Sequence, residues 1–348
     1  MKILYAVQAT GNGHISRAME LLPYLNEYGN TDIFLSGDNS NLAFDVQVKY
    51  RSKGLSLYYN CNGGLDYWKT TKAFQPSRLK KEIQELPVEK YDLVINDFEY
   101  ITAAACAKKN IASVSFGHQA SFQSPGTPRP FNKSITGEWI LKNYAKASRY
   151  IGLHFQPYDN FICPPVIKKE ILNADPKDKN YVTVYLPSWC EKQLFDLFSP
   201  LTGYSFQIFC GGIEHPKITG NIIFMPVNKT LFNHSFINCT GIITGAGFET
   251  PAEALHLRKK LLCIPIKGHY EQQCNAAALT EMGITCLKNI GDDFEEYFIR
   301  WIQSPQTVAV NYNNSSAKCI EFLFHHQQYL QESKEMATTP SGMLSFLL

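Results

Sequence analysis

The sequence predicts an α/β protein with two Rossmann-like domains. Three observations support this fold class. Short strand-like apolar runs alternate with helix-like stretches, which is the pattern of a parallel sheet. The alternation occurs in each half of the chain, and the pair Pro164-Pro165 between the halves is typical of a hinge. The length of 348 residues also agrees with two or three domains.

The first half opens with a strand, a tight turn and a helix. Gly11 and Gly13 end the first apolar run, and the stretch Ser16–Leu25 that follows places its apolar residues on one helical face. The expected strands of this half are Ile3–Val7, Ile33–Leu35, Leu93–Ile95 and Ser113–Phe116. We therefore expect residues 1–160 to form the first domain.

The second half repeats the alternation of strands and helices. Its expected strands are Tyr181–Leu186, Ser205–Cys210, Ile222–Met225, Gly241–Thr244 and Leu261–Ile266. A last helix, roughly Ser316–Glu332, places Cys319, Phe322 and Leu323 at helical spacing. We expect residues 161–315 to form the second domain, and residues 316–348 to be this helix and a tail.

Residues 241–276 are the most informative part of the chain. A glycine turn at Gly245 and Gly247 leads into a helix with Glu253, and the loop after the next strand carries Glu271 and Gln272. A glycine turn lets backbone N–H groups approach a diphosphate, and the helix N-terminus favours negative charge. The carboxylate in the helix could accept hydrogen bonds from two ribose hydroxyls. A buried βα unit whose glycines only permit close packing would have the same pattern.

Polar residues also follow the strands of the first half. His14 follows the first glycine turn, Asp97 and Glu99 follow the third expected strand, and His118 and Gln119 follow the fourth. Because parallel strands end at the same edge of a sheet, we expect these groups on one side. An imidazole that titrates near neutrality suits a general base. Loop histidines with only structural hydrogen bonds are the simpler alternative.

The stretch 241–276 is similar to the carboxy-terminal signature of inverting GT-B glycosyltransferases, the group of the peptidoglycan lipid II N-acetylglucosaminyltransferase and the UDP-glycosyltransferases. The matching positions are Gly247, Glu253, Pro265, Glu271-Gln272 and Asn275-Ala276. The first glycine turn resembles the first loop of the same family, and an uncharacterised archaeal and bacterial branch also carries Asp-Phe-Glu, as at Asp97. Two places depart from the signature: Glu249 in the glycine turn, and Lys267-Gly268-His269 before the acidic-Gln pair.

The resemblance implies a GT-B fold, in which the two domains face a central cleft and the last helix crosses back onto the first domain. It assigns His14 as the general base and Asp97 as its orienting carboxylate, with His118 as the rival base. In the family, the Glu in the helix binds ribose and the acidic-Gln pair binds the donor sugar. The donor-binding candidates are Gly11, Gly13, Gly245, Gly247, Glu249, Glu253, His269, Glu271 and Gln272.

The resemblance further implies transfer of a sugar from a nucleoside-diphosphate sugar, with UDP as the favoured nucleotide, to a hydroxyl acceptor. Retaining relatives carry a second Glu eight positions before the Glu in the helix, but here that position is Gly245, which favours inversion. The sequence has neither an Asp-x-Asp motif nor a metal-ligand spacing, so we expect no metal and no cofactor besides the sugar nucleotide. Backbone donors, the helix dipole and Lys267 would stabilise the leaving diphosphate.

The acceptor is expected to contact the segment 57–81, which mixes aromatic with basic side chains. Its members are Tyr58, Tyr59, Tyr67, Trp68, Phe74, Lys69, Lys72, Arg78, Lys80 and Lys81. Aromatic rings stack on sugars or pack on lipids, and basic groups attract anionic headgroups. This composition predicts a lipid-linked acceptor at a membrane surface, and an ordinary amphipathic helix near Arg78–Glu85 is the alternative.

Composition narrows the class of protein. A net charge of +2 and a pI of about 7.9 give no electrostatic argument for nucleic acid as a partner. Ten cysteines without a CxxC motif fit free thiols in a reducing cytoplasm. No run approaches the roughly 18 apolar residues of a membrane span. We expect a cytoplasmic enzyme, at the inner face of the membrane if its acceptor is lipid-linked.

Two other functions fit the same fold. A nucleotide-sugar epimerase or hydrolase would need an acidic pair at both faces of the sugar, for which Glu249 and Glu271 are candidates. A catalytically silent nucleotide-sugar-binding partner would keep Glu253 and the glycine turn, but His14 and Asp97 would lie far apart. Fold alone does not separate these functions.

Overall fold

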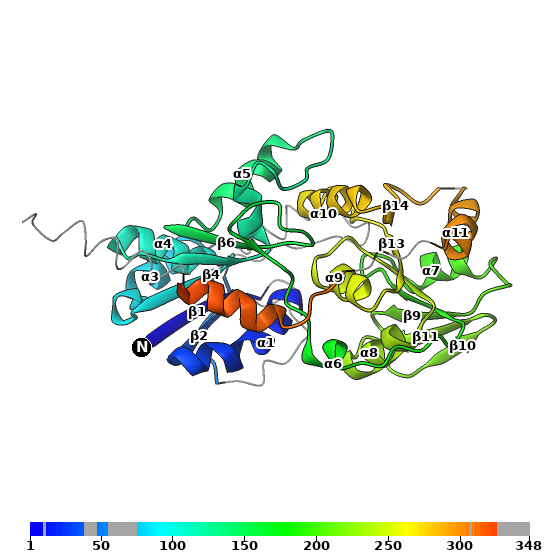
Figure 1. Cartoon of the computed structure of the whole chain (residues 1–348), viewed down its shortest axis with the longest axis horizontal. Helices are drawn as coiled ribbons and strands as arrows, with labels where there is room; N and C mark the ends of the chain where they lie inside the picture. Colours follow the sequence, from blue (N-terminus) through cyan, green and yellow to red (C-terminus); the bar gives the residue numbers. More distant parts are fainter. Residues whose placement is uncertain are drawn as a thin grey trace, which may run out of the picture.

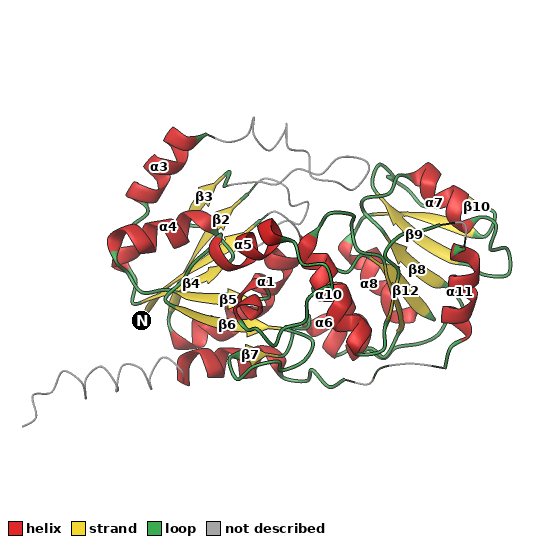
Figure 2. Cartoon of the chain, turned by 90° about the horizontal axis from the view of Figure 1, so that it is seen from above, coloured by secondary structure: helices red, strands yellow, loops and turns green. Residues whose placement is uncertain are grey.

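The computed structural model describes residues 1–9, 12–37, 47–54, 75–291, 293–305, 308 and 310–325. Its strands form two seven-stranded sheets, which lie at the two ends of the molecule with helices between them (Figure 2). The predicted α/β fold with two Rossmann-like domains is confirmed. Gly11, residues 57–74 of the expected acceptor segment and the tail after residue 325 lie outside the described residues.

The first sheet is entirely parallel. In spatial order its strands are β3 (Tyr50–Ser52), β2 (Asn30–Ser36), β1 (Lys2–Gln8), β4 (Leu93–Asp97), β5 (Val114–Gly117), β6 (Arg149–Leu153) and β7 (Ile162–Cys163). The connecting helices are α1 (Asn12–Tyr28), α3 (Pro76–Glu85), η1 (Val88–Lys90), α4 (Tyr100–Lys109), η2 (Gln119–Gln123) and α5 (Ile135–Asn143). The strand order reverses between β1 and β4, and such switch points are where open α/β sheets bind ligands.

The second sheet has the same arrangement apart from one antiparallel edge strand. Its strands are β10 (Lys217–Thr219), β11 (Ile222–Pro226), β9 (Phe206–Cys210), β8 (Val182–Tyr185), β12 (Gly241–Thr244), β13 (Lys260–Cys263) and β14 (Thr285–Cys286). Its helices are α6 (Lys169–Leu172), α7 (Glu191–Phe198), α8 (Lys229–Asn238), α9 (Glu249–His256), α10 (Tyr270–Glu281) and α11 (Phe294–Gln303). Here the order reverses between β8 and β12, so the glycine turn after β12 lies at the second switch point.

The chain returns to the first sheet after α11. Residues 315–325 are helical, and in Figure 1 this orange-red helix lies beside β1 and α1. Phe324 stacks on Tyr28 of α1 with ring centroids 3.8 Å apart. The preceding Tyr312 donates its hydroxyl to the carbonyl of Phe155 over 2.8 Å. Buried apolar residues of this helix, including Cys319 and Leu323, join the core beneath β1.

Candidate active site

The strongest group of polar contacts lies where the carboxyl ends of the two sheets meet. His14, in the first turn of α1, has its Nδ1 2.9 Å from Oδ1 of Asp97, the last residue of β4. Asp97 is completely buried, and the side chain of His14 is 15% exposed. The structure therefore brings together the two residues that the sequence proposes as base and orienting carboxylate.

Local sequence explains how Asp97 reaches this position. Phe98, the next residue, has a φ of 55°, in the left-handed region, so the chain turns sharply as the strand ends. On either side of the turn, the Asn96 side chain bonds the backbone of Glu99 twice, each time over 2.7 Å. The Glu99 carboxylate accepts from the backbone N–H groups of Ile101 and Thr102 and so caps α4. Glu99 thus has a structural contact, and Asp97 faces the site.

Arg17 completes this group, and it was not among the candidates from sequence. Its guanidinium donates to both carboxylate oxygens of Asp97 at 2.8 Å and, from Nε, at 3.1 Å. It also forms an ion pair with Glu249 of the second domain. Burial disfavours a charged guanidinium, but Asp97 and Glu249 outweigh this and raise the pKa of Arg17. The sequence does carry a signal, because positions i and i+3 of a helix share a face, which places Arg17 beside His14.

The network determines the charge on Asp97. Burial alone would raise the pKa of Asp97, but Arg17 and His14 outweigh it and lower the pKa to about 2. An ionised carboxylate only accepts hydrogen bonds, so the contact with Asp97 forms when Nδ1 of His14 carries a proton, whereas Nη2 of Arg17, 2.9 Å from the same nitrogen, donates only to a bare Nδ1. General base catalysis uses the first of these two arrangements. Nε2 of the neutral His14 then keeps a lone pair, which is the form that a general base requires.

Two glycines allow this close approach. A Cβ atom on Gly117, at the end of β5, would lie 2.6 Å from Oδ1 of Asp97. A Cβ atom on Gly13 would lie 2.5 Å from a carboxylate oxygen of Glu249. Both distances are shorter than real carbon contacts, so a side chain at either position would displace a member of the network. Gly13, in the first turn of α1, therefore leaves room for Glu249.

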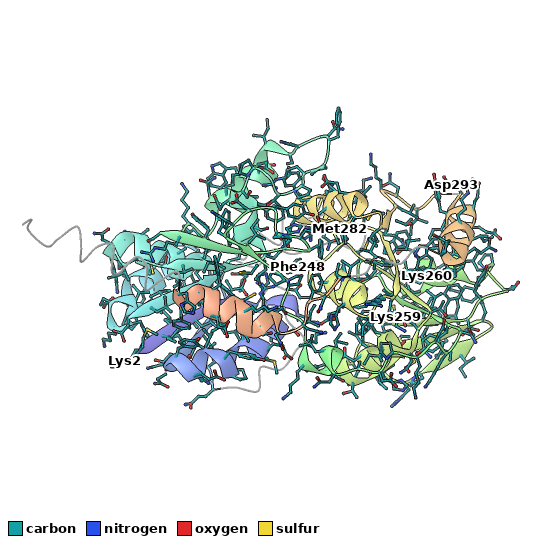
Figure 3. The ribbon with its side chains drawn as sticks, viewed as in Figure 1. Lys2, Phe248, Lys259, Lys260, Met282 and Asp293 are labelled. Carbon is teal, nitrogen blue, oxygen red and sulfur yellow. The ribbon has the colours of Figure 1, made fainter. Side chains whose placement is uncertain are left out.

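His118, the rival base, lies deeper between the domains. Its Nδ1 is 3.0 Å from the Leu153 carbonyl and its Nε2 is 2.8 Å from Oδ1 of Asn275. The ring also stacks on Phe248 at 4.0 Å, and Phe248 lies between the two halves of the molecule in Figure 3. Burial lowers the pKa of His118. Leu153 belongs to β6 of the first sheet and Asn275 to α10 of the second domain, so the His118 side chain connects the two domains.

The two expected sugar-binding residues lie on the second domain, at the start of α10. Glu271 accepts a hydrogen bond of 3.1 Å from Gln119 of the first domain. Burial would raise the pKa of Glu271, but His118, His269 and the Gln119 hydrogen bond together lower it. The Gln272 side chain accepts from the Ile266 backbone N–H over 2.9 Å.

The remaining donor candidates surround the second glycine turn. Gly245 faces Gln272, and a Cβ atom there would lie 3.4 Å from its side-chain oxygen. A Cβ atom on Gly247 would meet no atom within 4 Å. His269 is the N-cap of α10 and accepts from the backbone N–H of Gln272 over 3.4 Å.

Glu253, the expected ribose ligand, is buried and already has a partner. Both of its carboxylate oxygens lie 3.1 Å from Nζ of Lys168, in the segment that joins the domains. Burial raises the pKa of Glu253 even though the lysine charge opposes that shift. No sequence pattern indicates this pair, because the two residues are 85 positions apart.

The chain matches a known protein family. A family model described as Glycosyl transferase family 1 matches residues 1–300. The chain therefore belongs to glycosyl transferase family 1, and the protein is a glycosyltransferase. No curated protein sequence matches the chain.

Solved structures of the same fold cover nearly the whole chain. UGT89C1 of Arabidopsis thaliana complexed with quercetin is 13% identical with a TM-score of 0.59, over 93% of this chain and 98% of that chain. UGT2 of Phytolacca americana complexed with UDP-2fluoro-glucose and pterostilbene is 13% identical with a TM-score of 0.57, over 98% and 96%. The glycotransferase of kitacinnamycin is 14% identical with a TM-score of 0.57, over 94% and 95%. These likenesses show that the fold is GT-B.

The described part of the chain shows neither a metal cluster nor a membrane-spanning helix. No cluster of three or more His, Cys, Asp or Glu side chains is arranged there to hold a metal ion. Among the same residues, no helix is both long and apolar enough to cross a bilayer.

Proposed function

We propose that this glycosyltransferase moves a sugar from a UDP-sugar to a hydroxyl acceptor, with inversion and without a metal ion. The observation that carries the proposal is the contact between His14 and Asp97 at the switch point of the first sheet. The second switch point, with its glycine turn, lies across the domain interface and would hold the nucleotide.

In the proposed reaction, Nε2 of His14 removes the proton from the acceptor hydroxyl. The acceptor oxygen attacks the anomeric carbon from the face opposite the nucleotide, and the bond to the leaving diphosphate breaks, which inverts the configuration. Asp97, with its pKa of about 2, stays ionised and stabilises the imidazolium that forms. His118 has protein partners on both ring nitrogens, which favours His14 as the base.

For the donor, we propose that the backbone near Gly247 and the N-terminus of α9 bind the diphosphate, with Lys267 as a second source of positive charge. The space above Gly247 supports this placement. Glu253 would bind the ribose, and because it now pairs with Lys168, nucleotide binding would exchange that lysine for two hydroxyls. Glu271 and Gln272 would bind the sugar, as in the resembling family.

The identity of the acceptor is a separate part of the proposal. We propose a lipid-linked hydroxyl, as the composition of residues 57–81 predicts. Solved structures of this fold hold compounds of another kind, since UGT2 is complexed with pterostilbene and UGT89C1 with quercetin.

The contacts of His14 and Glu249 argue against the two competing functions, a silent binding partner and an epimerase or hydrolase. A silent partner protein would not need His14 and Asp97 side by side, yet these residues are hydrogen-bonded. An epimerase or hydrolase would need Glu249 free to act with Glu271. Glu249 instead forms an ion pair with Arg17.

Thermal unfolding against UDP, GDP, dTDP, ADP and several UDP-sugars tests the donor assignment. A ligand at about 100 times its Kd adds roughly 2.7 kcal/mol to the stability of the folded state. We expect a rise in Tm with UDP ligands that Glu253→Ala removes. If none of the nucleotides raises the Tm, or if Glu253→Ala shows the same rise as the wild type, the proposed donor site is contradicted.

His14→Ala tests the base separately. UDP release from UDP-sugars is measured with a panel of lipid-linked and aryl hydroxyl acceptors. We expect the variant to keep the UDP-dependent rise in Tm and to lose transfer by a factor of about 100 or more. His118→Ala is the matched control. If His14→Ala transfers at the wild-type rate, the base is wrongly assigned.

A further inference from the structure

Among the residues that the structure describes, four large exposed apolar side chains lie on α5 and the loop before it. Phe131 is fully exposed, Ile135 is 87% exposed and Trp139 is 64% exposed. Ile140 joins them at 41%. Exposed apolar residues that occur singly need no explanation, but a contiguous set marks an interaction surface. We call these four residues the α5 patch.

The fold presents this patch outward. Ile135 and Trp139 are four positions apart and so share one face of α5. The opposite face packs against the second domain, where Gly137 contacts the ring of Tyr270, and Leu141 lies in a buried cluster with that tyrosine. One face of α5 therefore packs against the second domain, and the other face carries the α5 patch.

The loop that carries Phe131 is held in place. Arg129 donates to the carbonyl of Phe122 over 2.9 Å and to the Glu138 carboxylate over 2.5 Å. Its guanidinium also lies 4.7 Å from the centre of the Phe122 ring. In Figure 1 this loop and α5 project from the upper edge of the molecule. The exposed phenylalanine is thus presented by a fixed segment at a projecting edge.

Basic side chains surround the patch. Lys133, Lys142 and Lys146 are all exposed, and they lie on the loop before α5, on α5 and just after the turn that follows it. The carboxylate within this segment, Glu138, binds Arg129 and Tyr270 and also pairs with Lys142 at 3.4 Å, so Lys133 and Lys146 carry most of the positive charge of the border. The patch therefore combines an apolar centre with a positive border.

We propose that the α5 patch binds the surface of a membrane that contains anionic lipids. Aromatic and aliphatic side chains enter the headgroup region, and lysines around them attract anionic headgroups. A protein partner is less suited to this border, because lysine is depleted at protein–protein interfaces. The projecting loop also suits insertion into a flat lipid surface.

Docking through α5 would bring the membrane close to the proposed donor-sugar site. Tyr270 of α10 touches the inner face of α5 and donates its hydroxyl to Glu138 over 2.8 Å. The next residue is Glu271, a proposed ligand of the donor sugar. A helix is about 10 Å thick, so a membrane on the outer face of α5 would lie close to that site. Membrane binding is nevertheless measured without any substrate and does not depend on the proposed reaction.

The test is sedimentation of the full chain with vesicles of phosphatidylcholine alone, and with vesicles of equal parts phosphatidylcholine and phosphatidylglycerol. We expect binding to the anionic vesicles, weakened by salt. The double variant Phe131→Ser with Trp139→Ser should bind about tenfold more weakly or worse, because two large side chains lose their apolar contact. Lys133→Gln with Lys146→Gln should weaken binding to the anionic vesicles.

Ile218→Ser is the matched control, because Ile218 is 75% exposed on β10, outside the α5 patch. It should bind vesicles as the wild type does. Each variant is also checked for an unchanged Tm and an unchanged Tm rise with UDP, which separates membrane binding from the donor site. Absence of vesicle binding, or equal binding by the patch and control variants, overturns the proposal. A dimer that only the patch variant dissociates, without vesicle binding, would assign the surface to a second copy of the chain.

Discussion

Arg17→Met is the most direct test of the buried network, because it removes one charge and keeps most of the side-chain length. The Arg17 side chain is 2% exposed and Asp97 is completely buried. After the change, Asp97 would remain buried without its cationic partner. Breaking a buried ion pair in this way costs about 3–5 kcal/mol of the free energy of unfolding.

The pKa of Asp97 gives a second estimate of the free energy of unfolding that this network contributes. The folded protein lowers this pKa from 3.8 to about 2, and each unit corresponds to about 1.36 kcal/mol, so ionised Asp97 contributes about 2 kcal/mol. For a lowered pKa, the contribution is fully present above pH 3.8 and is lost as the pH falls toward 2. Arg17→Met should raise the pKa of Asp97 toward or above its unfolded value, so this loss of stability in acid should shrink or disappear.

Urea unfolding at neutral pH and through the acid range measures both effects. We expect Arg17→Met to lose 2–5 kcal/mol, by the two estimates above, and Arg17→Lys to lose less because it keeps the charge. Adding Asp97→Asn to Arg17→Met should recover stability, because it removes the unpaired carboxylate. A loss below about 1 kcal/mol, or a double variant no more stable than Arg17→Met, would refute the argument.

Two further variants test separate parts of the site. Gly117→Ala would place a Cβ atom 2.6 Å from Oδ1 of Asp97, so we expect transfer to fall by a factor of about 10 or more while UDP still raises the Tm. Gly203→Ala, where a Cβ meets nothing within 4 Å, is the control, and equal activity of both variants would contradict the steric argument. Glu99→Ala removes the cap of α4 and should cost about 1 kcal/mol of stability without affecting the rate of transfer by the folded enzyme. Loss of transfer in folded Glu99→Ala would show that this carboxylate is more than a cap.

The sequence predicts the fold well because its evidence is local. Strand, turn and helix follow one another within short stretches, and hydrophobic periodicity reports them directly. The glycine turn after β12 could be placed at the sheet edge for the same reason, whereas Gly13, expected in a turn, lies in the first turn of α1. The edge strands of both sheets, β3, β7, β10 and β14, have only two or three residues each. They were missed because such runs are too short to show a period.

The site is predicted less completely. His14 and Asp97 could be proposed as a pair because both follow strands of one parallel sheet, and such ends share an edge. Arg17 was missed because the helix pattern around it is apolar, and its second partner, Glu249, lies 232 positions away. The pairing of Glu253 with Lys168 likewise joins distant segments.

By itself, the sequence determined the order of the main strands and helices, the glycine turn after β12 and the residue types available for chemistry. The tertiary structure alone decided which of those residues meet, including the links from Arg17 to Glu249 and from His118 to Asn275 across the domain interface. The physical reason is that periodicity and turn chemistry act between near neighbours in the chain. Contacts between domains depend instead on how the two finished sheets pack, which no short stretch of sequence encodes.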